Sequence, residues 1–177
     1  MALLGALSIQ GTAAMTTGNA QQAVTVHGAF YHCAPMSLEV GSVIRSGNWG
    51  RIVRATSIAG VNDGTSKIIF ELAYENSRLL HNPSAPSRLD CLFCCPTLEE
   101  AQAYREAQQP TGIIYKVLPI DPSTPIHVTS WLLWGLGTGS NFTQSQKRLK
   151  DYWTATPTEQ REVLVGGPVQ IIDIVGE

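Results

Sequence analysis

The order of the apolar segments constrains the fold of this chain more than any other feature. Short segments rich in Val, Ile and aromatic residues, typical of strands, mix with three segments in which apolar residues recur at helical spacing. The two kinds do not alternate strictly, as they would in a doubly wound parallel sheet, so the sequence favours a single α+β domain. With 44% hydrophobic and 15% charged residues among 177, the chain can bury a sizeable core.

Local signals mark where the helices begin and end. Residues 66–82 carry an apolar face, and Ser66 is a candidate cap. Thr97 with Glu100 three residues later matches a capping box, which predicts a helix from Leu98 to Gln108. The pattern also predicts a helix over 143–155. Strands are expected at 23–34, 87–95, 112–120, 159–165 and 169–175, and a Gly-flanked turn is expected around Trp49.

The N-terminal residues differ in composition from the rest of the chain. Residues 1–23 are rich in Ala, Gly, Thr and Gln and have no period, which is typical of a flexible arm. Their apolar start resembles a signal core, but the first basic residue is Arg45, and the lack of early positive charge favours the arm. We therefore expect an arm over 1–23 and a folded domain over 24–177.

Charge and hydropathy restrict the expected partners. No apolar run approaches the ~18 residues that a membrane helix needs, so no membrane partner is expected. The net charge of −2 does not attract nucleic acid to the surface as a whole. A small basic patch is present at Lys147, Arg148 and Lys150, so a local nucleic-acid contact stays open.

Four cysteines occur, and three of them lie within five residues in the segment CLFCC. The C-x-x-C spacing of Cys91 and Cys94 is found in zinc sites, but a second ligand pair would have to come from His32 and Cys33. If the segment is a strand, Cys91 and Cys94 point to opposite faces. Buried free thiols are the favoured interpretation, with no bound metal expected, and a zinc site is the alternative.

Residues 159–165, EQREVLV, place an amide and a carboxylate two residues apart at the start of an expected strand. Alternate residues of a strand point to the same face, so Gln160 and Glu162 are expected side by side. The neutral interpretation is a solvated strand edge. The alternative is a catalytic glutamate beside an amide that holds a nucleophile.

Several stretches, in their order along the chain, give it a resemblance to a known superfamily. They are AFYHCAPMSLEVGSVI, LFCCPTLEEAQAY, GIIYKVLPI and EQREVLVGGPVQII. Together they resemble the His-type branch of the ADP-ribosyltransferases, which includes diphtheria toxin, the poly(ADP-ribose) polymerases and the rifampin ADP-ribosyltransferases. PSRLDCLFCC and DYWTATPTEQREVLV are also similar to an uncharacterised bacterial domain family related to these enzymes. The resemblance covers roughly residues 24–175 and implies a split sheet, mixed or antiparallel, flanked by helices.

The resemblance implies a pocket for NAD, which would be a substrate. His32 would hydrogen-bond the adenosine ribose, and Cys33, where relatives carry Gly, would contact the nicotinamide carboxamide through its backbone. Phe93, where relatives more often carry Tyr, would stack on the nicotinamide. Arg88, just upstream of the same strand, is expected to meet the pyrophosphate as a bidentate donor.

The same resemblance makes Glu162 the catalytic carboxylate and Gln160 a residue that faces the acceptor. Cleavage of the nicotinamide–ribose bond builds oxocarbenium character on the sugar, and a carboxylate stabilises that charge most in the transition state. Such an enzyme would be a glycosyltransferase, and a bacterial protein of this kind would be a toxin, an effector or a defence enzyme. It is expected in the cytoplasm, or outside it if it is secreted or delivered as an effector.

Three functions are therefore carried forward. The first is an NAD-dependent ADP-ribosyltransferase whose acceptor is a nucleic acid, a protein or a small molecule such as an antibiotic. The second is a degenerate module that binds NAD, ADP-ribose or a protein partner without catalysis, which the departures at Cys33 and Phe93 motivate. The third is a thiol or zinc protein built on CLFCC.

Overall fold

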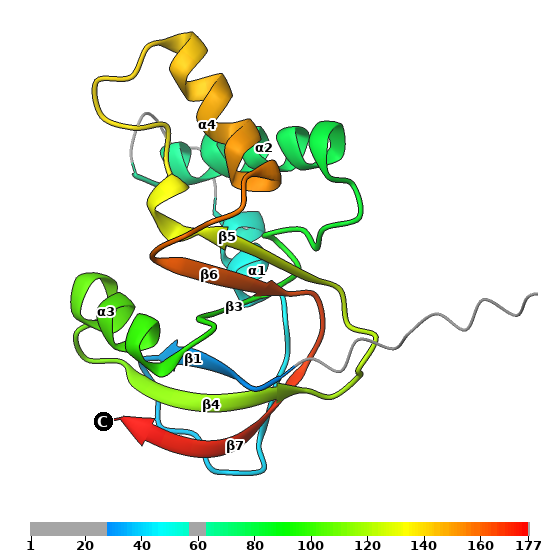
Figure 1. The fold of residues 1–177 in the computed structure, drawn as a ribbon, viewed down its shortest axis with the longest axis vertical. Helices are drawn as coiled ribbons and strands as arrows, with labels where there is room; N and C mark the ends of the chain where they lie inside the picture. The colour runs from blue at the N-terminus through cyan, green and yellow to red at the C-terminus, as the bar shows by residue number, and fades with distance from the viewer. Residues whose placement is uncertain (1–27, 57–62, 177) are drawn as a thin grey trace, which may run out of the picture.

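The computed structural model describes residues 28–56 and 63–176. In this part of the chain, seven strands form two antiparallel sheets, one in the order β1-β4-β7-β2 and one in the order β3-β6-β5 (Figure 1). The α+β class expected from the sequence is confirmed. The strands are β1 (Phe30–Ala34), β2 (Val43–Ile44), β3 (Leu92–Cys94), β4 (Ile113–Pro119), β5 (Ile126–Ser130), β6 (Arg161–Val165) and β7 (Val169–Gly176).

Helices pack against both sheets. The α2 and α4 helices lie together over the three-stranded sheet, on the side away from the four-stranded sheet, and α3 lies beside β1 and β4 (Figure 1). The helices are α1 (Asn48–Ala55), α2 (Asp63–His81), α3 (Leu98–Gln108) and α4 (Phe142–Thr154), with a 3₁₀ turn η1 (Trp131–Leu133) after β5. None of the helices in the described part of the chain is long and apolar enough to cross a membrane.

The three-stranded sheet contributes to two apolar cores, because side chains alternate between the two faces of its strands. On β6, Val163 and Val165 pack toward the four-stranded sheet, whereas Leu164 packs with Tyr152 and Trp153 of α4. Glu162 lies two residues before Leu164 and therefore faces the same, helix-covered side. This alternation decides which groups surround the carboxylate.

The two sheets are joined where β1 passes the end of β3. Tyr31 N donates to Cys95 O at 2.9 Å, and Cys95 N donates to Tyr31 O at 2.7 Å, which makes an isolated antiparallel bridge. The last two strands are not partners, since β6 pairs with β3 and β5 while β7 pairs with β4 and β2. The Gly166–Gly167–Pro168 connection thus carries the chain from one sheet to the other.

Most of the expected elements are present, but several boundaries differ. The strands expected at 23–34 and 87–95 are shorter, Phe30–Ala34 and Leu92–Cys94 within the described residues. The helix from Leu98 to Gln108 is confirmed, and the Thr97 side chain accepts from Glu100 N. Ser66 does not cap a helix, because α2 begins at Asp63. The last-but-one strand begins at Arg161, two residues later than expected. The expected arm over 1–23 lies outside the described residues.

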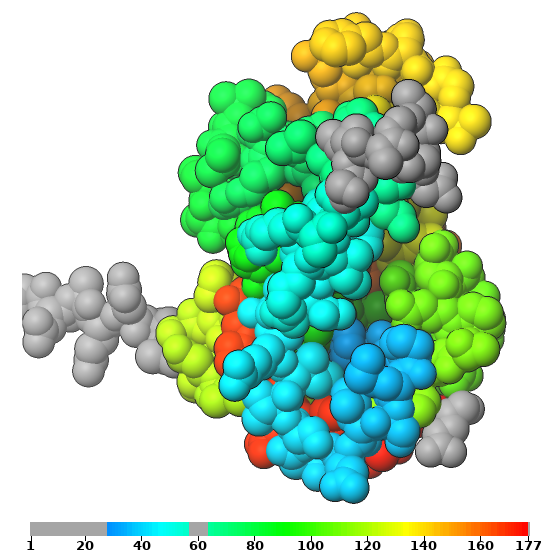
Figure 2. Space-filling model, turned by 180° about the vertical axis from the view of Figure 1, so that it is seen from behind, coloured from blue at the N-terminus to red at the C-terminus, as the bar shows by residue number. Residues whose placement is uncertain are grey.

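Trp49 lies in α1 and not in a turn, so that expectation is wrong. Glycines flank the tryptophan for different reasons: Gly47 has a φ of 80° and caps the helix, while Gly50 lets the helix approach the backbone of residue 89. A Cβ on Gly50 would lie 1.8 Å from Leu89 O. The segment that ends in α1 runs across the back of the molecule, where it is drawn in light blue and cyan (Figure 2).

Candidate active site

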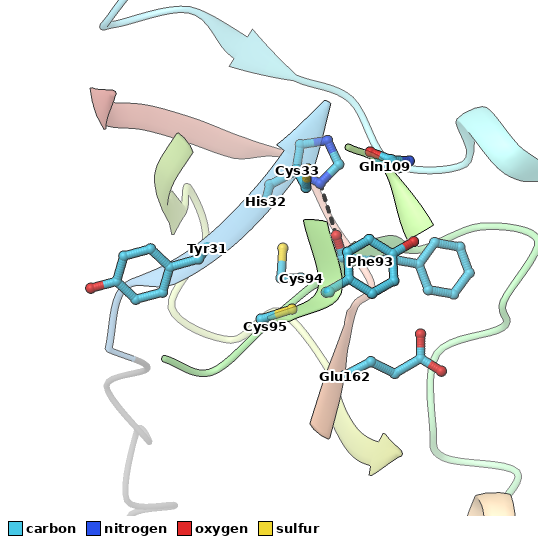
Figure 3. A pocket seen from close by; sticks show the side chains of 9 residues that line it. Tyr31, His32, Cys33, Phe93, Cys94, Cys95, Gln109 and Glu162 are labelled. Atoms are coloured by element: carbon cyan, nitrogen blue, oxygen red, sulfur yellow. Dashed lines mark hydrogen bonds between the residues drawn. The ribbon is translucent and has the colours of Figure 1, made fainter. Parts of the chain in front are cut away.

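A pocket of about 110 Å³ opens where β1, β3 and the start of β6 meet (Figure 3). The pocket is smaller than the roughly 150 Å³ apolar cavity that holds one six-membered ring. Four residues singled out from the sequence, His32, Cys33, Phe93 and Glu162, line this pocket although they are far apart in the chain. The full lining is Tyr31, His32, Cys33, Phe93, Cys94, Cys95, Tyr104, Gln109 and Glu162.

His32 projects from β1 toward β3, and its Nδ1 lies 2.8 Å from Phe93 O (Figure 3). A carbonyl oxygen only accepts, so Nδ1 carries a proton and donates it. Burial lowers the pKa of His32, against the opposing effect of this hydrogen bond. The neutral ring therefore keeps a lone pair on Nε2, which can accept a hydroxyl from a ligand.

The backbone of Cys33 faces the edge of β1 that borders the pocket. In an antiparallel strand, the N–H and C=O of alternate residues point to the same edge. The N–H and C=O of Tyr31 bond Cys95, on the edge away from β4. Cys33 is two residues later, so its N–H and C=O also point away from β4. This places one donor and one acceptor beside the pocket, as a carboxamide requires.

Glu162 is 7% exposed and is held by two side chains. The Tyr152 hydroxyl donates to Oε1 at 2.8 Å, and Arg88 Nη1 lies 3.5 Å from the same oxygen. Burial raises the pKa of Glu162, while Arg88 and the Tyr152 hydrogen bond oppose that rise. Burial also raises the pKa of Tyr152, so its hydroxyl stays a neutral donor.

Arg88 lies behind the pocket wall and is not among the lining residues. It is 6% exposed, and its Nε lies 3.3 Å from both carboxylate oxygens of Glu71. Two carboxylates therefore engage the guanidinium that was expected to meet a pyrophosphate. The structure gives Arg88 a contact with the candidate catalytic residue in place of an open position for a diphosphate.

Gln160 is not placed as the strand pattern implied. Because β6 begins at Arg161, the alternation that put Gln160 and Glu162 on one face does not extend to Gln160. Gln160 has a φ of 45°, and its carbonyl accepts from Trp131 N and from the Ser130 hydroxyl. It lies outside the pocket lining, and its contact with an acceptor stays a prediction.

Three pocket residues carried no signal in the sequence. Tyr31 precedes His32 on β1, Tyr104 comes from α3, and Gln109 follows the last turn of α3. The Gln109 Oε1 is buried and has no hydrogen-bond partner among the described residues. An amide oxygen without a partner in a pocket wall is suited to accept a ligand N–H group. Only the tertiary contact of α3 with β1 brings this group to the pocket.

The cysteines are buried free thiols. Burial raises the pKa of Cys33 and Cys94 above the ordinary value, and it raises the pKa of Cys95 to about 12. Protonated thiols are weak nucleophiles. Those of Cys33, Cys94 and Cys95 line the pocket as small apolar groups. In the residues that the structure describes, no cluster of three or more His, Cys, Asp or Glu side chains is arranged to hold a metal ion.

A family model described as "Protein of unknown function (DUF2441)" matches residues 42–177. The chain belongs to this family. The DUF2441 region contains β3, α3 and β6, and therefore Phe93, Gln109 and Glu162, but it begins after β1. His32 and Cys33 thus complete the pocket from outside the matched region. No curated protein matches the chain significantly.

Proposed function

We propose that this protein is an NAD-dependent ADP-ribosyltransferase. One observation carries the proposal: a single pocket gathers His32, Cys33, Phe93 and Glu162. These are four of the positions to which the resemblance assigns NAD binding and catalysis. The pairing of β1 with the end of β3, and of β3 with β6, brings them together.

The nicotinamide ring of NAD fits the chemistry of this pocket. Phe93 offers an aromatic face, and the Cys33 N–H and C=O offer a donor and an acceptor for the carboxamide. The Gln109 Oε1, which has no hydrogen-bond partner in the described part of the chain, offers a second acceptor for the carboxamide N–H. The pocket, at about 110 Å³, would have to widen to admit the whole ring. The rest of the dinucleotide would extend outward past His32, whose Nε2 would accept from a ribose hydroxyl.

Glu162 would act on the bond between nicotinamide and ribose. When this bond breaks, its electron pair moves to the ring nitrogen, nicotinamide leaves as a neutral molecule, and positive charge develops on the sugar. In its ionised form, the Glu162 carboxylate would stabilise that charge more strongly than it stabilises the ground state. The acceptor nucleophile would then bond the sugar carbon and lose its proton.

The acceptor is a nucleic acid, a protein or a small molecule, and Gln160 is proposed to border it. The left-handed backbone of Gln160 directs the chain into β6 beside Trp131. The Trp131 ring lies 6.0 Å from that of Tyr104, which lines the pocket. Its Oε1 is buried without a partner among the described residues, as is Trp131 Nε1. A polar acceptor group could satisfy both atoms. Incubation with labelled NAD, followed by separation of protein, RNA, DNA and small molecules, identifies the acceptor class.

The decisive test is Glu162→Gln. Gln has nearly the same shape but no negative charge, so nicotinamide release at saturating NAD should fall about 10²–10³-fold, or ~2.7–4 kcal/mol in activation free energy. NAD affinity should change much less, because the charge matters chiefly as the bond breaks. The exposed Glu106 on α3 supplies a matched control, since Glu106→Gln should leave release unchanged.

Equal release by the parent and the Glu162→Gln variant would contradict the proposed mechanism. If neither protein releases nicotinamide but both bind NAD, the chain is the degenerate binding module. Stoichiometric zinc on the purified protein would favour the thiol or zinc protein. The last two outcomes each point to one of the two alternative functions.

A further inference from the structure

A buried chain of polar contacts leads to Glu162 from the far side of the pocket wall. Trp49 Nε1 donates to Glu71, and Glu71 accepts from Arg88. Arg88 Nη1 donates to the Tyr152 hydroxyl, which in turn donates to Glu162. The exposed fractions of Glu71, Arg88 and Tyr152 are 1%, 6% and 0%. Five segments of the fold therefore meet in one water-excluded cluster.

The surroundings of Arg88 fix its orientation. Its guanidinium carbon lies 4.2 Å from the ring centroid of Trp134 and 4.8 Å from that of Phe93. Tyr74 and Tyr152 complete an aromatic cage at 5.3 and 5.1 Å. Such contacts favour a planar cation, and a lysine could not make the same set. Phe93 belongs both to this cage and to the pocket lining.

The contacts on Glu162 are concentrated on one oxygen. Both Tyr152 and Arg88 approach Oε1, and within the described residues no hydrogen bond or ion pair engages Oε2. Because Glu162 lines the pocket, this arrangement holds one oxygen on the protein and leaves the other for a ligand. A carboxylate held in this way needs no reorganisation when positive charge develops nearby.

We propose that Arg88 is a positioning residue for Glu162: clamped by Glu71, it holds the ionised carboxylate at the pocket wall. The role of this contact in catalysis rests on the proposed function. The contact itself does not, so it can be tested without NAD. Arg88 thereby acquires a role different from the one the sequence implied.

The members of this cluster are expected to shift the pKa of Glu162 in opposite directions. Removing the Arg88 charge or the Tyr152 hydroxyl should raise the pKa of Glu162, because each stabilises the carboxylate. Removing the like charge of Glu71 should lower it. The ionisable groups that face Glu162 are Glu71 and Tyr74 from α2, Arg88 and Cys91 from the segment before β3, Cys95 after β3, Tyr104 from α3, Tyr152 from α4 and His32 from β1.

The first measurement is the titration of the Glu162 carboxyl by ¹³C NMR, assigned by its loss in Glu162→Gln. Relative to the parent midpoint, Arg88→Gln and Tyr152→Phe should raise the midpoint, Glu71→Gln should lower it, and Arg88→Lys should restore it toward the parent value. Arg54→Gln is the matched control, because it removes an arginine from an exposed ion pair with Asp90 and should leave the midpoint unchanged.

The second measurement is the pH profile of nicotinamide release at saturating NAD. The acid limb should follow the NMR midpoint of each variant. Arg88→Lys keeps the charge but loses the fork geometry, so it should lower kcat about 10²-fold with little change in KM. A role in packing alone would instead lower the stability of the fold without moving the pH profile.

The outcomes separate the inference from the proposed function. If the midpoints move as stated but the parent releases no nicotinamide at any pH, the positioning contact stands and the transferase proposal fails. If the midpoints of Glu71→Gln and Tyr152→Phe both equal the parent value, the positioning role is overturned. These two variants keep nearly the parent shape, so they test the inference even if Arg88→Gln does not fold.

Discussion

His32 lies where β1 passes the end of β3, and its ring has two different roles. Its Nδ1–H group bonds Phe93 O, which ties the two sheets together. Its Nε2 carries the lone pair that the pocket presents to a ligand. The same protonation state serves both roles, because the fold requires Nδ1 to donate and burial keeps the ring neutral. A histidine predicted as a ligand contact is therefore also part of the structure.

The lowered pKa of His32 makes the stability of the fold depend on pH. The folded pKa lies below the unfolded value of 6.5, so the stabilisation is present above pH 6.5 and is lost as the pH falls toward the folded pKa. In chemical denaturation, the free energy of unfolding of the parent relative to His32→Asn should therefore decrease from pH 7.5 to pH 5.5. The control is His81→Asn, at the exposed end of α2. A difference that is constant with pH would contradict this prediction.

At the scale of elements, α3 connects the pocket to the start of β6. The Glu100 carboxylate receives Arg161 Nε at 2.8 Å and Arg161 Nη2 at 2.9 Å, a bidentate pair just before Glu162. The other end of the helix presents Tyr104 and Gln109 to the pocket. The helix that the sequence predicted with correct bounds thus supports both walls of the site, although its sequence signal indicated only where it begins and ends.

The N-cap of α3 should contribute to stability on its own. Thr97→Ala removes the acceptor for Glu100 N and should lower the free energy of unfolding by ~1 kcal/mol. Urea denaturation measures the change. Thr154→Ala is the control, because that exposed hydroxyl bonds only a carbonyl of its own helix and its loss should cost less than about 0.5 kcal/mol. Equal effects of the two changes would argue against a capping role for Thr97.

At the scale of the whole molecule, α1 supports the site from a distance. The helix packs through Gly50 against the backbone of Leu89, next to Arg88. Trp49 of the same helix bonds Glu71, which clamps Arg88 from α2. The chain of contacts from Trp49 to Glu162 therefore depends on the close packing of the Gly50 and Leu89 backbones.

Gly50→Ala tests this dependence. The added Cβ would overlap Leu89 O, so either the helix or the Arg88 segment must move, which should lower the free energy of unfolding by about 1–3 kcal/mol. Nicotinamide release should fall as well, because the Arg88 contact with Glu162 is displaced. Gly28→Ala is the matched control, since no atom lies within 4 Å of its Cβ position. A folded Gly50→Ala protein with parent-like stability would exclude the packing constraint.

The sequence by itself determined the features that depend on near neighbours in the chain. The α3 helix was predicted with its cap because Thr97 and Glu100 are three residues apart, and β4 was predicted from its own apolar run. The α+β class followed from the order of such segments. The same local patterns misassigned Trp49 to a turn and began the β6 strand at Glu159, which placed Gln160 within the strand. The reasons for Gly50 in a helix and for the left-handed backbone of Gln160 are tertiary contacts, which local patterns do not contain.

The tertiary structure alone decided which of these residues meet. Pairing of β1 with the end of β3, and of β3 with β6, brought His32, Phe93 and Glu162 to one pocket. The tertiary structure also places Gln109 in the pocket lining and pairs Arg88 with Glu71 and Glu162. The physical reason is that a buried charge must find its partners in space. Those partners come from α2, α4 and β6, at separations for which the sequence has no periodic signal.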